Sequence, residues 1–137
     1  MKKIVFIFLF LPIISLAQLD YKNYNKAIKY NSKGNIKKAI KYAYKVLEDN
    51  PEWRKPNLLL ASIYTKLDSV ELAANFILKV YDRSNPKDIG LLDKLIKLYY
   101  AHGYYHETLS FLEIVTSDSL TMNFNVEKYI NNCNFGI

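Results

Sequence analysis

The most informative segment of this chain is residues 27–51, AIKYNSKGNIKKAIKYAYKVLEDNP. Four of its residues return twice at nearly constant spacing. The set Ala27, Tyr30, Ala39 and Val46 reappears 34 positions later as Ala61, Tyr64, Ala73 and Val80, and 35 positions after those as Ile96, Tyr99, Thr108 and Val115. Pro51 and Pro86 close the first two copies. A period of about 34 residues predicts an all-α chain built from helical hairpins that pack in sequence order.

In the first copy, a glycine separates two segments that have helical periodicity. Residues 20–32 form the first predicted helix, and Gly34 ends it because glycine takes the left-handed C-cap conformation without a Cβ clash. Asn35 can cap the next helix, which we expect to run to about Asn50. Its apolar residues at helical spacing are Ile36, Ala39, Ile40, Ala43, Val46 and Leu47.

The later copies contain similar signals for the start and end of each helix. The second hairpin opens near Arg54, and Asp68 with Glu71 resembles a capping box for its second helix. The third opens near Lys87, after a break at residues 84–86, and Gly103 takes the place of Gly34. The predicted buried positions are Leu59, Leu60, Ile63, Tyr64 and Leu67, then Leu72, Ala73, Phe76, Ile77 and Val80, then Leu91, Leu92, Leu95, Ile96 and Tyr99, and last Leu109, Leu112 and Val115.

The two ends of the chain differ from the repeats. Residues 1–17 read as a secretory signal with a charged start, an apolar run from Ile4 to Leu11 and a small-x-small site before Gln18. The apolar stretch is shorter than the roughly 20 residues of a spanning helix, and an uncleaved anchor is the alternative. We therefore expect residues 18–137 to form an exported bacterial protein, periplasmic or secreted. After a polar turn at residues 117–121, a helix at about 125–132 suits a terminal capping element.

Composition limits the class of protein. A length of 137 residues favours one domain. Half of the residues are hydrophobic and 15% are aromatic, which excludes a disordered chain. The single cysteine, Cys133, cannot form an internal disulfide, so stability must come from helix packing.

The repeat resembles the tetratricopeptide repeat family over three copies, at about residues 20–53, 54–87 and 88–121. The family places small residues where two helices cross, as in the pairs Ala27/Ala39 and Ala61/Ala73, and a tyrosine late in its first helix. The chain departs from the family at Ile96 and Thr108, which are larger, at Asn23 and Asn57, which stand at an early aromatic position, and at Asp68, which replaces a turn glycine. The resemblance implies a right-handed superhelical solenoid whose first helices line a concave binding surface.

By this resemblance, the concave face carries a mixture of aromatic, polar and apolar residues suited to an extended peptide or a partner helix. The candidates are Tyr21, Tyr24, Ile28, Asn31, Leu58, Ser62, Thr65, Lys66, Asp93, Lys97 and Tyr100. We expect Tyr21, Tyr24 and Tyr100 to be the main aromatic contacts, and most other aromatic residues to pack between helices.

A basic run marks the first hairpin. Its eight lysines, with no acidic residue among them, are Lys22, Lys26, Lys29, Lys33, Lys37, Lys38, Lys41 and Lys45. Such a field can steer an acidic protein, a polyanionic glycan or lipid headgroups to this surface. The other interpretation is a solvated face that keeps an exported protein soluble. We expect no nucleic-acid partner, because an exported chain rarely meets one.

Signals for catalysis are weak. His102 and His106 are four residues apart, a spacing that can bind a metal on a helix, but Gly103 interrupts the helix and the order is not H-E-x-x-H. Cys133 has no evident base beside it. We therefore predict no catalytic residue, metal or cofactor. The predicted function is a non-enzymatic interaction module. The alternative is a structural or sensor portion of a larger envelope assembly or truncated receptor.

Overall fold

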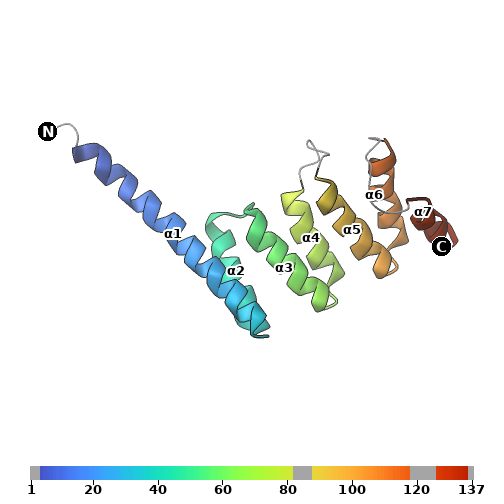
Figure 1. Cartoon of the computed structure of the whole chain (residues 1–137), viewed down its shortest axis with the longest axis horizontal. Helices are drawn as coiled ribbons and strands as arrows, with labels where there is room; N and C mark the ends of the chain where they lie inside the picture. Colours follow the sequence, from blue (N-terminus) through green and yellow to red (C-terminus); the bar gives the residue numbers. More distant parts are fainter. Residues whose placement is uncertain (1–3, 82–87, 118–125, 136–137) are drawn as a thin grey trace. The chain divides into compact units, whose positions relative to one another are not determined.

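The computed structural model describes residues 4–81, 88–117 and 126–135. Over these residues the chain forms seven helices and no strand (Figure 1), which confirms the all-α prediction. They are α1 (Ile4–Ser32), α2 (Ile36–Asp49), α3 (Arg54–Lys66), α4 (Val70–Val80), α5 (Ile89–Ala101), α6 (Tyr105–Ser117) and α7 (Val126–Phe135). The break predicted at residues 84–86, the opening at Lys87, the turn at 118–121 and the start at Asn125 lie outside the described residues.

The chain divides into two compact units, Met1–Ile63 and Tyr64–Ile137, with the boundary inside α3. In the first unit α1 and α2 pack side by side (Figure 1). Ala27 and Ala39 are completely buried on these two helices, as the small residues of a close helix crossing should be. Asn35 caps α2 as predicted, because its side chain accepts a hydrogen bond from the Lys38 N–H at 3.2 Å.

The first helix begins earlier than expected, at Ile4 and not near Asp20. No glycine interrupts the chain between these positions, and the backbone of residues 4–17 continues the helix of residues 18–32. Among the described residues, no helix combines the length and the apolarity needed to cross a bilayer.

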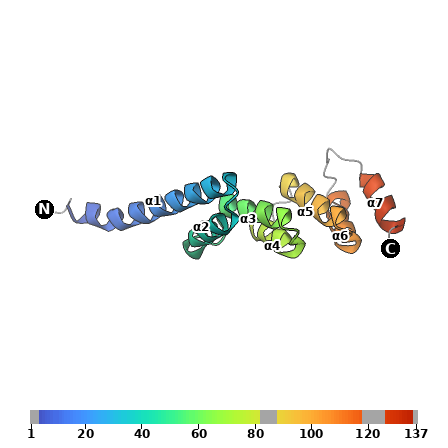
Figure 2. The ribbon, with the colours of Figure 1, turned by 90° about the horizontal axis from the view of Figure 1, so that it is seen from below.

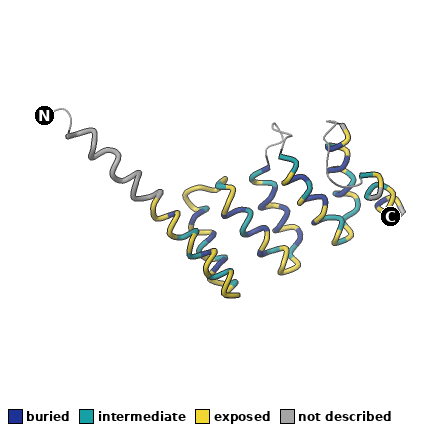
Figure 3. The backbone as a smooth tube through the Cα atoms, in the orientation of Figure 1, coloured by how far each residue is buried: buried dark blue, intermediate teal, exposed yellow. Residues whose placement is uncertain are grey.

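In the second unit each helix packs against the next, α4 on α5, α5 on α6 and α6 on α7 (Figure 2). Buried positions recur along α5 at helical spacing (Figure 3) and include Leu91, Leu95 and Ile96. Thr108 is completely buried on α6, and its hydroxyl donates to the Tyr104 carbonyl at 2.8 Å. The core can therefore hold this polar residue, because its hydroxyl is satisfied by the carbonyl of the residue that precedes α6.

The three turns between paired helices have the same backbone geometry. Each contains one residue with a left-handed φ: Gly34 at 72°, Asp68 at 58° and Gly103 at 77°. In each turn the next N–H reaches the carbonyl of the repeat tyrosine: Asn35 to Tyr30 at 2.9 Å, Ser69 to Tyr64 at 2.9 Å and Tyr104 to Tyr99 at 3.0 Å. This six-residue closure is the Schellman arrangement of helix C-termini.

The capping box predicted at Asp68 and Glu71 is wrong. Ser69 is the N-cap of α4, and its side chain makes no capping hydrogen bond. Asp68 is instead the left-handed residue of the turn. Aspartate tolerates this conformation better than most residues because its short polar side chain can bond locally.

Two predicted core residues are on the surface. Leu67 is 50% exposed because α3 ends at Lys66 and Leu67 lies in the turn. Leu72 is 44% exposed because α4 buries another face, formed by Val70, Ala73, Phe76 and Ile77 with Ala74. The apolar period correctly marked α4, but one of its leucines lies outside the buried face.

Candidate binding surface of the first hairpin

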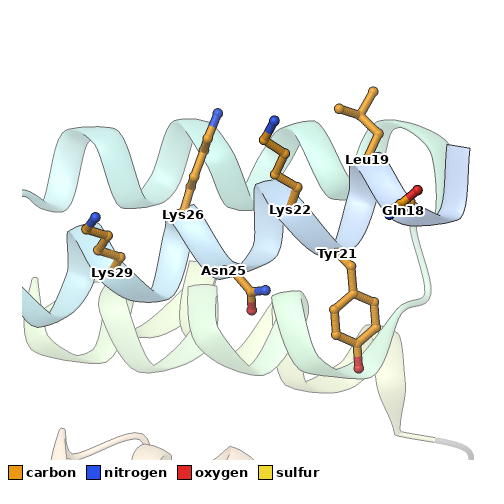
Figure 4. Close-up of a pocket in the computed structure, with 7 residues that line it drawn as sticks. All are labelled: Gln18, Leu19, Tyr21, Lys22, Asn25, Lys26 and Lys29. Carbon is orange, nitrogen blue, oxygen red and sulfur yellow. The ribbon is translucent and has the colours of Figure 1, made fainter. Parts of the chain in front are cut away.

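The lysine-rich surface of α1 and α2 is as exposed as the sequence predicts. Seven of the eight lysines are exposed, and Lys26 is half-buried. Figure 4 shows Lys22 and Lys26 extending from the same side of α1, whereas Tyr21 and Asn25 point to the opposite side. Among the described residues, no carboxylate pairs with any of the eight ammonium groups. Their charge is therefore available to a partner.

Two of these lysines are held in place by aromatic rings. The Lys26 ammonium lies over the Tyr42 ring at 5.0 Å, and the Lys38 ammonium over the Tyr30 ring at 5.2 Å. Tyr30 and Tyr42 stack on each other with centroids 5.5 Å apart and planes 8° from parallel. The four side chains form a column across the α1–α2 seam. Each exposed cation–π contact contributes about 0.5–1 kcal/mol, so the column orients positive charge without neutralising it.

This column was not predicted. A sequence signal exists, because each lysine stands four residues before a tyrosine on its own helix, Lys26 before Tyr30 and Lys38 before Tyr42. The actual contacts cross to the other helix, which only the packing of α1 on α2 decides.

An open hollow of about 690 Å³ lies along α1, and three of the lysines line it. Lys22, Lys26 and Lys29 line it together with Tyr21, Asn25 and Leu19, and with Gln18 at its end (Figure 4). Positive charge, amide groups and an aromatic ring thus meet on one helix. This combination suits carboxylate or other anionic groups on an extended ligand.

Two of the four predicted first-repeat contacts, Tyr21 and Tyr24, lie beside a residue that the sequence analysis missed. Trp53 lies half-buried before α3, and the rings of Tyr21 and Tyr24 each approach it to 5.6 Å between centroids. Ile28 is 43% exposed on α1, and Asn31 is half-buried. Trp53 is the one tryptophan in the chain, which could have drawn attention to it.

A second hollow, of about 630 Å³, is also lined by Tyr21. Tyr21 and Trp53 line it with the carboxylates of Asp20, Asp49 and Glu52. Asp20 is only 6% exposed, and its Oδ2 accepts a hydrogen bond from Asn50 Nδ2 at 2.6 Å. The two hollows of the first unit therefore carry opposite charge.

The predicted contacts of the second repeat are mostly at the surface. Ser62, Thr65 and Lys66 are exposed on α3, and Leu58 is half-buried. Leu58 and Ser62 belong to the first unit, whereas Thr65 and Lys66 belong to the second.

The predicted contacts of the third repeat are already engaged by neighbouring side chains. Lys97 Nζ lies 2.8 Å from Asp93 Oδ2, and this hydrogen bond raises the pKa of Lys97 above its usual value. The Tyr100 hydroxyl accepts a hydrogen bond from Asn132 Nδ2 at 2.8 Å, and its ring meets Tyr129 edge-on at 4.6 Å. Helix α7 thus contacts the end of α5 where the resemblance implies a groove.

The residues considered for metal binding or nucleophilic chemistry have other surroundings. His102 Nδ1 lies 2.8 Å from the Leu98 carbonyl and Nε2 lies 3.0 Å from Asp68 Oδ1, while His106 is exposed. No cluster of three or more potential metal ligands occurs in the described part of the chain. Cys133 is completely buried in α7, and burial raises the pKa of its thiol.

Compared with protein-family models and with curated proteins, the chain matches none. The resemblance to tetratricopeptide repeats therefore depends on the residues that recur within this chain.

Proposed function

We propose that this chain is an exported, non-enzymatic interaction module of the tetratricopeptide type, which binds an acidic peptide or partner helix along α1. Three left-handed turns at repeat spacing support the family assignment. So do the stacked aromatic pairs Tyr30–Tyr42, Tyr64–Phe76 and Tyr99–Phe111, whose members are 12 residues apart in every hairpin. The family implies a right-handed solenoid in which α7 is the terminal cap.

The class of ligand is inferred from the positive charge of the first hairpin. Among the described residues, the eight lysines have no carboxylate partner. Seven of them lie on α1 and α2, Lys33 lies in the turn between these helices, and α1 also exposes Tyr21 and Ile28. Positive charge raises the encounter rate with an acidic segment, and the apolar side chains provide area for short-range contact. Solubility alone would not require Tyr21, at 52% exposure, and Ile28, at 43%, to be exposed on the same helix as these lysines.

A titration with a fluorescently labelled acidic peptide tests this function. We compare the purified protein with Lys22→Gln/Lys29→Gln and with the control Lys55→Gln/Lys94→Gln, which removes the same charge from exposed sites on α3 and α5. Lys26 stays unchanged because it packs on Tyr42. The first variant should lose affinity roughly tenfold and show a weaker salt dependence, whereas the control changes little. Equal losses in both variants, or affinity unaffected by salt, would contradict a specific acidic ligand.

Export is the second part of the proposal. A bacterial host that secretes the protein should yield a chain beginning at Gln18, detected by intact mass. Ala17→Asp, which destroys the small residue before the cleavage site, should leave the longer chain. A full-length chain from the unaltered gene would contradict the cleaved signal.

The alternative is a structural subunit that stacks on copies of itself. The exposed side chains Leu19, Tyr21 and Ile28 on α1 favour it, since apolar surface of this kind can be covered by another copy. Light scattering decides between the two: a concentration-independent monomer favours the peptide-binding module, and an oligomer lost in Ile28→Glu favours the structural subunit.

A further inference from the structure

We propose that the hollow beside Trp53 binds the guanidinium group of an arginine in the same partner peptide, next to its acidic run. This inference rests on the proposed function and adds a second, oppositely charged position to it. The first unit would then recognise a pattern of charge along the ligand and not acidity alone.

The aromatic wall of this hollow is suited to a flat cation. The rings of Tyr21 and Trp53 lie 5.6 Å apart at 47°, and Tyr24 supports Trp53 from the same helix as Tyr21, at 5.6 Å and 38°. Tyr21 is 52% exposed, so its ring is accessible. Tryptophan and tyrosine faces attract cations through their quadrupole, and arginine makes such contacts more often than lysine.

The carboxylates around the hollow favour a positively charged ligand. Asp20, Asp49 and Glu52 contribute three negative charges within a few residues of the rings. In the described part of the chain no lysine, arginine or histidine forms an ion pair with them. A guanidinium group can bond a carboxylate and stack on a ring at the same time, which an ammonium group does less well.

Hydrogen bonds from two sides fix the segment that lines the hollow. Asp20, a buried residue of the lining, accepts a hydrogen bond from Asn50, and the backbone N–H of Trp53 donates to the Asn50 carbonyl at 3.1 Å. On the α3 side, the fully buried Asn57 donates from Nδ2 to the carbonyls of Pro51 and Trp53, both at 2.9 Å. The segment that carries Glu52 and Trp53 is therefore preorganised, which lowers the entropic cost of binding.

Tyr21 connects this hollow to the basic one, because it lines both. A peptide that passes over Tyr21 would place carboxylates against Lys22 and Lys29 and the next basic side chain against Trp53. Charge complementarity then fixes the direction of the peptide as well as its affinity.

Two peptides of equal length test the proposal. One carries an acidic run followed by arginine, and the other has citrulline in place of arginine, which keeps the shape and removes the charge. Trp53 is the one tryptophan in the chain, so its fluorescence reports events at the hollow. We expect the arginine peptide to bind about tenfold more tightly and to change the Trp53 emission.

Variants locate the effect. Asp49→Asn/Glu52→Gln should remove the preference for arginine, while Glu48→Gln, an exposed residue of α2 that does not line the hollow, should keep it. All three positions are exposed, so these variants should fold, and circular dichroism verifies this.

The outcomes separate this inference from the proposed function. If both peptides bind equally, or the preference survives in Asp49→Asn/Glu52→Gln, the arginine site is wrong and the acidic ligand stands. If neither peptide binds but N-acetylarginine amide quenches Trp53 in the unaltered protein and not in that variant, the arginine site stands and the acidic ligand fails. Absence of both signals overturns both proposals.

Discussion

The rings of Tyr64 and Phe76 stack with centroids 5.7 Å apart and planes 2° from parallel. Tyr64 lies in the last turn of α3, and Phe76, only 4% exposed, lies on α4. The same contact joins Tyr30 to Tyr42 and Tyr99 to Phe111. In each hairpin one ring comes from the turn tyrosine, whose carbonyl also closes the turn, so helix ending and helix pairing are fixed at one place.

Removal of a ring from this contact should destabilise the protein strongly. Phe76→Ala leaves a cavity and removes the stacking, and we expect a loss of about 3–5 kcal/mol in the free energy of unfolding. Asn75→Ala, at the exposed neighbour on α4, should change it by less than about 0.5 kcal/mol. Urea denaturation followed by circular dichroism measures both. Similar values for the two variants would show that the stacked pair does not stabilise the hairpin.

The left-handed turns predict opposite effects of the same substitution at different glycines. Gly34→Ala and Gly103→Ala should each cost about 1–2 kcal/mol, because their φ values of 72° and 77° are unfavourable for a residue with a Cβ atom. Nothing lies within 4 Å of the added Cβ at either position, so the cost is conformational and not steric crowding. Thermal denaturation tests this expectation.

Gly90 is the matched control for these turns. It lies in the first turn of α5 without a left-handed φ, and an added Cβ would meet only Asp88 Oδ1, at 4.0 Å. Gly90→Ala should therefore stabilise the protein by up to about 1 kcal/mol. Destabilisation at Gly90 equal to that at Gly34 would contradict the conformational explanation.

The buried thiol of Cys133 reports whether α7 stays attached to α5. Tyr100→Ala removes the hydrogen bond from Asn132 and the ring contact with Tyr129, and should speed the reaction of Cys133 with Ellman's reagent about tenfold or more. Tyr100→Phe removes only the hydroxyl and should speed it by roughly two- to fivefold. Ser110→Ala, exposed on α6, is the control. An unchanged rate in Tyr100→Ala would mean that α7 is held by other contacts.

Alkaline conditions should weaken the second unit. Burial, reinforced by Glu107 and Glu71, raises the pKa of Tyr99 above its ordinary value of 10.0. A raised pKa means that the folded state holds the proton more tightly than the unfolded state. The free energy of unfolding is therefore unaffected below the unfolded pKa and falls as the pH rises past about 10. Lys97 and Cys133, whose pKa values are also raised, act in the same direction.

Urea denaturation at several pH values checks this dependence. Tyr99→Phe keeps the ring against Phe111 and removes the ionisable group, so its stability should fall less steeply at alkaline pH than that of the unaltered protein. Parallel curves for the two proteins would show that Tyr99 does not contribute to the alkaline loss.

Local signals placed most helix boundaries correctly. Asn35, Gly34 and Gly103 act as predicted because capping depends on a few neighbouring backbone groups. The errors lie where local rules compete. Asp68 has the residue type of an N-cap, but the turn needed a left-handed residue there. Leu72 fits the apolar period of α4 yet lies outside the face that α4 buries.

The candidate site was only partly predictable. The eight lysines and Tyr21 could be identified from the sequence because, apart from Lys33 in the turn, they lie on helices of known periodicity. The contacts of Trp53 with Tyr21 and Tyr24 could not be predicted, because Trp53 precedes α3 and reaches these rings only through the return of the chain after α2. Asp20 and Asn50 are 30 residues apart, and no local pattern predicts that they meet.

The order of residues alone determined that this protein is helical, where its hairpins turn and that its first hairpin is basic, since these properties depend on neighbours within one or two turns of chain. Tertiary packing decided which rings stack, which lysines lie over tyrosines, that α7 meets Tyr100 and that Tyr21 lines both an acidic and a basic hollow. Those contacts join residues on different helices, and their geometry follows from how closely the helices approach, a distance set by many side chains together.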